Sequence, residues 1–126
     1  MTGAQEELIE AVCATGKPVV LILVAGKPFA IPFAKKNVPA ILVQWYAGEQ
    51  AGNSIADILF GKVNPSGKIS FSFPQSSGHL PAFYNHLTTD KGFYKEPGTY
   101  ELPGRDYVFS SPNPLWAFGH GLSYTT

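Results

Sequence analysis

The strongest structural signal in this chain of 126 residues is one apolar stretch, Val19-Val20-Leu21-Ile22-Leu23-Val24. Continuous runs of β-branched and aliphatic residues are typical of strands that are covered on both faces of a parallel sheet. A second run of this kind, Ala40-Ile41-Leu42-Val43, follows after a short interval. The two runs therefore predict two central, parallel strands.

The segments around these strands predict helices. Residues 5–15 carry apolar side chains at helical spacing, and Gly16 is placed to end that helix. Residues 29–36, between the two apolar runs, predict a short helix. A third helix is predicted to follow the loop of residues 44–50 and to end at Gly61.

The remaining chain divides into an edge strand and an irregular tail. Residues 68–73 alternate polar with apolar side chains, which predicts a strand near a sheet edge. Alternating helices and strands favour an α/β fold, a three-layer α/β/α sandwich with a mostly parallel sheet. Residues 75–114 show no sustained period. We expect a single domain over residues 1–126, with its α/β core in 1–74 and a loop-rich tail in 75–126.

Composition limits the possible partners. Nine Lys and Arg balance nine Asp and Glu, so no net charge attracts the chain to nucleic acid or to an anionic membrane. No apolar run is long enough to span a bilayer, and the N-terminal residues do not resemble a signal peptide, which predicts a soluble chain. A single cysteine, Cys13, excludes an internal disulfide and leaves the compartment undetermined.

The loop after the second strand holds the best candidate site. In α/β sheets, ligands bind at the carboxyl ends of the strands. Here Trp45 and Tyr46 offer aromatic rings, and Glu49 and Gln50 offer hydrogen-bonding groups, a combination that suits a sugar ring. The alternative is structural: the two aromatic residues pack in the core while Glu49 and Gln50 cap the next helix.

Other catalytic chemistry is poorly supported. Glycoside hydrolysis usually needs two carboxylates, and Glu49 supplies only one of them. The other acidic candidates are expected to be solvated; they are Asp57, Asp90, Glu96, Glu101 and Asp106. The dispersed His79, His86 and His120 do not suggest a metal site. The glycines near the loop match no nucleotide-binding motif, so a flavodoxin-like nucleotide site is a weak alternative.

Several phrases, taken in order, give the chain a family resemblance. They are residues 5–9, Thr15-Gly16-Lys17-Pro18-Val19-Val20, Gly26-Lys27-Pro28, Val38-Pro39-Ala40-Ile41-Leu42, Trp45-Tyr46-Ala47-Gly48-Glu49-Gln50-Ala51-Gly52-Asn53, residues 56–61, Asn64-Pro65-Ser66-Gly67-Lys68, residues 80–86 and Phe118-Gly119-His120-Gly121-Leu122-Ser123-Tyr124-Thr125-Thr126. Together they resemble glycoside hydrolase family 3, specifically the later part of the C-terminal α/β domain of bacterial β-glucosidases and β-xylosidases.

The resemblance implies a retaining hydrolase of β-linked glucosides or related sugars that needs no cofactor. It places the nucleophilic Asp in a separate barrel domain and the acid/base Glu in a loop just before the stretch matching Gln5. Some plant members carry that Glu in the loop matching residues 48–52, where Gln50 stands here and cannot act as an acid. Glu49 is its neighbour and a weak catalytic candidate, so we expect the chain to be inactive alone.

The resemblance also implies that the domain is incomplete. Earlier strands and helices of the family domain would precede Gln5, so the strand at residues 19–24 is expected to expose an unpaired edge. We therefore expect the missing barrel domain as a partner, or self-association through that edge. The compartment of the parent protein, whether cytoplasmic, periplasmic or extracellular, stays open.

A different class of function remains as an alternative. In this alternative, the segment is a stand-alone module that binds a carbohydrate or another protein without hydrolysing it. Sugar binding that disappears in Trp45→Ala, in the absence of turnover, would separate such a module from an inert segment of an enzyme.

Overall fold

A computed structural model describes residues 3–80, 82–84 and 113–125. Five elements follow in order: α1 (Gln5–Ala14), β1 (Val20–Leu23), α2 (Pro32–Asn37), β2 (Ala40–Val43) and α3 (Ala51–Leu59). Within these ranges no helix is long and apolar enough to cross a membrane.

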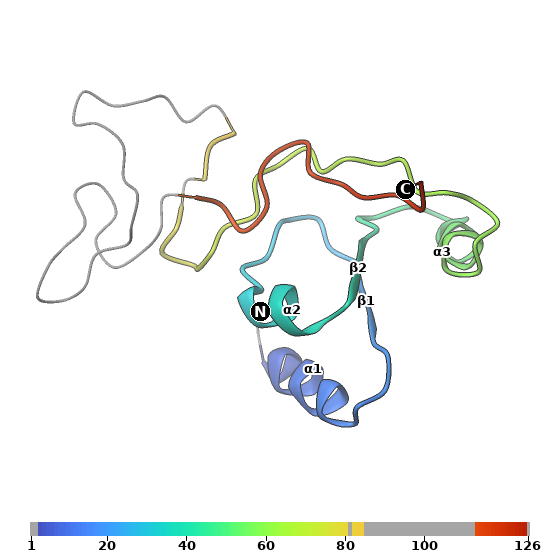
Figure 1. Cartoon of the computed structure of the whole chain (residues 1–126). Helices are drawn as coiled ribbons and strands as arrows, with labels where there is room; N and C mark the ends of the chain where they lie inside the picture. Colours follow the sequence, from blue (N-terminus) through green and yellow to red (C-terminus); the bar gives the residue numbers. More distant parts are fainter. Residues whose placement is uncertain (1–2, 81, 85–112, 126) are drawn as a thin grey trace, which may run out of the picture.

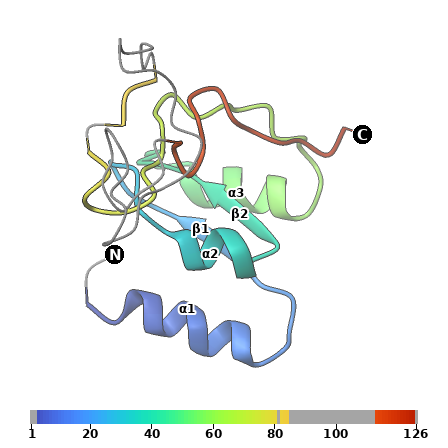
Figure 2. The same cartoon turned by 60° about the vertical axis from the view of Figure 1, so that its left-hand side comes forward.

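The sheet at the centre is parallel, as the two apolar runs predict. Strands β1 and β2 pair in register from Val20 opposite Ala40 to Leu23 opposite Val43. The pairing continues one step further, because the backbone N–H of Gln44 donates to the carbonyl of Leu23 at 2.9 Å. Figures 1 and 2 show α1 and α2 on one face of this sheet and α3 on the other. The predicted α/β class is therefore confirmed.

The helices differ from the prediction mainly at their ends. Helix α2 begins at Pro32 rather than at residue 29, because proline is well suited to the first position of a helix. Helix α1 ends one residue early, and Gly16 follows it in the left-handed region at φ 71°. Gly61 after α3 has φ 73°, which is the conformation expected of a glycine at a helix end.

The predicted edge strand at residues 68–73 is wrong. The segment forms no regular strand in the described part of the chain and lies antiparallel to residues 115–120 instead. Phe73 and Trp116 form an isolated bridge, in which the N–H of Phe73 donates to the carbonyl of Trp116 at 2.8 Å. Figure 1 shows the two segments running side by side above the sheet.

The core lies between the sheet, α2 and this irregular pair. Its buried members are Leu23, Ile31, Ala34, Val38, Phe73 and Leu115. Cys13 of α1 is partly buried against this cluster. A residue near the C-terminus thus completes a core that the first half of the chain begins.

Several hydrogen bonds that involve side chains join residues 113–125 to the helices and to the turn after α3. The Nζ of Lys35 in α2 donates to the carbonyl of Leu115. The hydroxyl of Tyr124 donates to the carbonyl of Ile58 in α3 at 2.7 Å, and the backbone N–H of Tyr124 donates to Oδ1 of Asn64, also at 2.7 Å. Residues 113–125 are therefore bound to elements on both faces of the sheet.

Candidate functional site

Two loops meet at the carboxyl ends of the strands. One runs from β1 to α2 and contains Gly26 and Pro28; the other runs from β2 to α3 and contains residues 44–50. The amide Nε2 of Gln44 donates to the carbonyl of Ala51 at 2.9 Å, which ties the start of the second loop to the first residue of α3. The structure thus places the sequence-predicted loop where α/β sheets place ligands.

Trp45 turns inward at the start of this loop. Its φ of 59° lies in the left-handed region, where it is the sole non-glycine residue among those described. The indole is half-buried and packs edge-on against Phe71, with ring centroids 5.7 Å apart, and lies 6.5 Å from Phe73. Such a backbone conformation is unfavourable for a bulky residue, so the aromatic packing stabilises it.

Tyr46 turns outward and remains 78% exposed. Its ring lies against Gly26 of the neighbouring loop: a Cβ built on Gly26 would come within 2.6 Å of Cε2 of Tyr46. The two aromatic residues therefore separate, one into the core and one to the surface. Tyr46 alone presents most of its ring to solvent at the end of the sheet.

Glu49 and Gln50 lie exposed at the start of α3. Gln50 is the residue before the helix, but its side chain caps no backbone N–H. Its Oε1 instead accepts a hydrogen bond from Nδ2 of Asn53 at 2.6 Å. The helix N-terminus supplies a partial positive charge beside Glu49. Both side chains are exposed, so a ligand can reach them.

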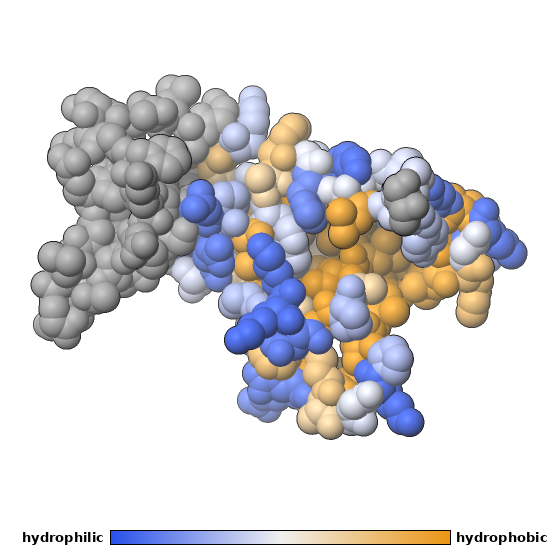
Figure 3. All heavy atoms as spheres, viewed as in Figure 1, coloured by the Kyte–Doolittle hydropathy of each residue, from blue (hydrophilic) through white to orange (hydrophobic). Residues whose placement is uncertain are grey.

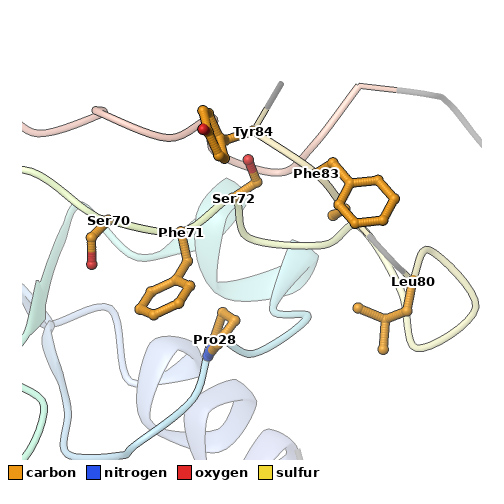
Figure 4. A pocket seen from close by; sticks show the side chains of 8 residues that line it. Pro28, Ser70, Phe71, Ser72, Leu80, Phe83 and Tyr84 are labelled. Carbon is orange, nitrogen blue, oxygen red and sulfur yellow. The ribbon is translucent and has the colours of Figure 1, made fainter. Parts of the chain in front are cut away.

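A shallow pocket of about 310 Å³ lies beside the β1–α2 loop, which contributes Pro28. Its lining comprises Pro28, Ser70, Phe71, Ser72, Leu80, Ala82, Phe83 and Tyr84. Figure 4 shows the ring of Phe71 facing Pro28, with Leu80 and Phe83 at the other side. The sequence did not indicate this pocket, because residues 68–73 were expected to form a strand near a sheet edge.

The described residues contain no group of three His, Cys, Asp or Glu side chains that could hold a metal ion. His79 is buried, and Nδ1 of His79 accepts the N–H of Gln75 at 3.2 Å. The ring of His120 stacks on that of Trp116, with the ring centroids 6.3 Å apart. Asp57 forms an ion pair with Lys62 at 3.1 Å. The remaining candidates lie outside the described residues; they are His86, Asp90, Glu96, Glu101 and Asp106.

Comparison with known proteins identifies relatives over the whole chain. Residues 1–124 match the model of the glycosyl hydrolase family 3 C-terminal domain. A periplasmic beta-glucosidase of Salmonella typhimurium is 47% identical over 98% of this chain, and a beta-xylosidase of Formosa agariphila is 41% identical over 98%. In both cases the chain spans 16% of the relative's length.

A solved structure gives the same result. The beta-glucosidase from Listeria innocua, crystallised in complex with isofagomine, is 41% identical and superposes with a TM-score of 0.77. The match covers 96% of this chain and 17% of that one. Sequence and fold therefore agree on the same part of these relatives.

Proposed function

Since the chain belongs to glycosyl hydrolase family 3, we propose that it is the sugar-facing part of the C-terminal domain of a retaining β-glucosidase or β-xylosidase. The observation that supports this role most directly is the exposed ring of Tyr46 at the carboxyl end of the sheet. An exposed aromatic ring in a loop that also carries exposed hydrogen-bonding side chains matches the apolar face and the hydroxyl rim of a pyranose. Trp45 contributes by fixing the backbone from which Tyr46 projects.

Glu49 and Gln50 are proposed to donate or accept hydrogen bonds to sugar hydroxyls, and Glu49 is not proposed as the catalytic acid. A retaining mechanism needs two carboxyl groups about 5–5.5 Å apart across the scissile bond. Among the described acidic residues, Asp57 is paired with Lys62, and the glutamates of α1 lie across the sheet from α3. The chain alone is therefore proposed to bind sugar without hydrolysing it, and both catalytic carboxyl groups to come from other parts of the parent protein, the nucleophilic Asp from a barrel domain.

Two assays test this function. The purified chain and its Glu49→Gln variant are incubated with an aryl β-glucoside and an aryl β-xyloside, and neither protein is expected to release the phenol. Turnover by the wild type that disappears in Glu49→Gln would make Glu49 a catalytic acid and overturn the proposal.

Binding is measured by NMR titration with methyl β-D-glucoside. We expect resonances of residues 44–50 to shift in the wild type and in Phe60→Ala, a control that removes a ring with 83% exposure outside the loop. The shifts should be lost in Tyr46→Ala. Equal binding by Tyr46→Ala and the wild type would remove Tyr46 from the site.

The free edge of β1 suggests a partner for the chain. In the described part of the chain β1 pairs only with β2, so its other edge is unpaired, and several apolar side chains of α1, of β1 and of the residue after β1 are exposed. They are Leu8, Val12, Val20 and Val24. Figure 3 shows an apolar surface over the region of the strands and α3. We propose that, without a barrel-bearing chain, two copies pair through their β1 edges, since edge strands template pairing and a net charge of zero does not oppose association.

Size-exclusion chromatography with light scattering across a dilution series tests this association. The wild type is expected to form a dimer that dissociates on dilution, and Val20→Lys, which places a charge on a half-exposed edge side chain, to stay monomeric. A wild type that is monomeric at every concentration would refute the pairing.

A further inference from the structure

Gly26 and Tyr46 make a contact that joins the two loops. A Cβ on Gly26 would lie 2.6 Å from Cε2 of Tyr46 and 3.4 Å from both Cδ2 and Cζ. Atoms do not approach a Cβ as closely as 2.6 Å, so the ring occupies its place only because residue 26 has no side chain. Gly26 does not have a positive φ, so its backbone would accept alanine. Contact with the Tyr46 ring, and not the backbone, is what requires glycine here.

The backbone of Tyr46 has little freedom to adjust, whereas its ring can move. Its backbone follows Trp45, whose left-handed conformation is held by packing on Phe71 and Phe73. The ring itself is 78% exposed and is not held by surrounding core atoms. A side chain at position 26 would therefore rotate the ring away from the β1–α2 loop without disturbing the buried residues. Such a displacement would change the candidate site but leave the stability of the fold nearly unchanged.

From this geometry we propose that Gly26 is a positioning residue for sugar recognition: it lets the edge of the Tyr46 ring rest on the β1–α2 loop and so sets the orientation of a ring whose own loop also carries Glu49 and Gln50. The inference rests on the proposed function. The ligand class is a β-linked pyranose, whose apolar face stacks on an aromatic ring and whose equatorial hydroxyls reach the side chains of the loop.

The experiment compares Gly26→Ala, Tyr46→Ala, the double variant and Gly67→Ala. Gly67 serves as the matched control, because a Cβ there meets nothing within 4 Å and its φ is not positive. The first readout needs no sugar: nuclear Overhauser contacts between the Tyr46 ring and the Hα protons of residue 26 are expected in the wild type and lost in Gly26→Ala. The urea midpoint of unfolding should stay unchanged in that variant.

The second readout is the affinity for methyl β-D-glucoside by NMR titration. Gly26→Ala should weaken binding about three- to tenfold, the range set by one aromatic contact. Gly67→Ala should bind as the wild type does. The double variant should bind no worse than Tyr46→Ala, since the two substitutions act on one ring.

The possible failures are distinguishable. A wild type that does not bind the glucoside overturns the proposed function and, with it, the role of Gly26. A wild type that binds, together with a Gly26→Ala variant that binds equally well or keeps the ring contact, overturns only the positioning role. Additive losses in the double variant would also contradict it, because Gly26 would then act independently of Tyr46.

Discussion

Replacing Phe73 with alanine is expected to lower the free energy of unfolding by about 3–5 kcal/mol. Phe73 is 1% exposed and is among the largest fully buried side chains described. A phenylalanine side chain carries about 150–250 Å² of surface, which at about 25 cal/mol per Å² amounts to about 4–6 kcal/mol on full burial. Alanine retains part of this term, while the cavity left behind adds to the loss.

Phe73 connects three parts of the chain, so removing its ring affects all three. The ring of Phe73 packs edge-on against Trp116 at 5.6 Å and lies 6.5 Å from Trp45, and its backbone is paired with Trp116. Because whole domains are stable by about 5–15 kcal/mol, this variant should be close to unfolding without denaturant.

Urea denaturation followed by far-UV circular dichroism and by tryptophan fluorescence measures the loss. The fluorescence reports directly on this site, because both tryptophans of the chain pack near Phe73. Phe60→Ala, which removes a ring that is 83% exposed, should change stability by less than about 0.5 kcal/mol. A Phe73→Ala variant as stable as Phe60→Ala would refute the position of Phe73 at the centre of the core.

Three further substitutions test other parts of the fold by the same urea assay. Gly52→Ala should stabilise the chain by about 0.5–1 kcal/mol, because Gly52 lies inside α3 and a Cβ there meets nothing within 4 Å; a loss of stability would contradict this placement. Gly121→Ala should destabilise, since its Cβ would lie 2.5 Å from the carbonyl oxygen of Gly67, and a neutral effect would show that the two segments do not meet. Lys35→Met should cost about 1–3 kcal/mol, because the ammonium group donates to a backbone carbonyl and lies 5.4 Å from the centre of the Trp116 ring; an unchanged midpoint would remove this link between α2 and the C-terminal segment.

The parallel sheet and its helices were predictable because their signals are local. Two uninterrupted aliphatic runs identify β1 and β2, and the glycines at positions 16 and 61 identify the ends of α1 and α3. Each of these features depends on residues close in sequence. The family resemblance is confirmed by the match over residues 1–124.

The partner of residues 68–73 was not predictable from a local pattern. The alternation predicted a strand near a sheet edge, but the segment forms no regular strand, Phe71 is 53% exposed and Ser72 is buried. The hydroxyl of Ser72 accepts the N–H of Phe118 at 3.3 Å. Pairing with the C-terminal segment, far along the chain, determines which side chains are buried, and nothing within residues 68–73 specifies that segment.

At the candidate site, the sequence indicated the loop but not the orientation of its aromatic residues. Trp45 and Tyr46 stand next to each other and were expected to act together as one platform, or to pack together in the core. A left-handed φ at Trp45 separates them, and a bulky aromatic residue gives no sequence signal for that conformation. The contact between Gly26 and Tyr46 also joins two loops that only the folded sheet brings together.

The pairing of residues 69–73 with residues 115–120 has a consequence for biosynthesis. A ribosome makes the chain from its N-terminus, so Ile31, Ala34 and Phe73 emerge well before Leu115, which shares their core. Until Leu115 has been translated, these apolar side chains lack a native neighbour, and contacts of long sequence separation form slowly. During that interval the nascent polypeptide is exposed to aggregation and is a natural client for chaperones.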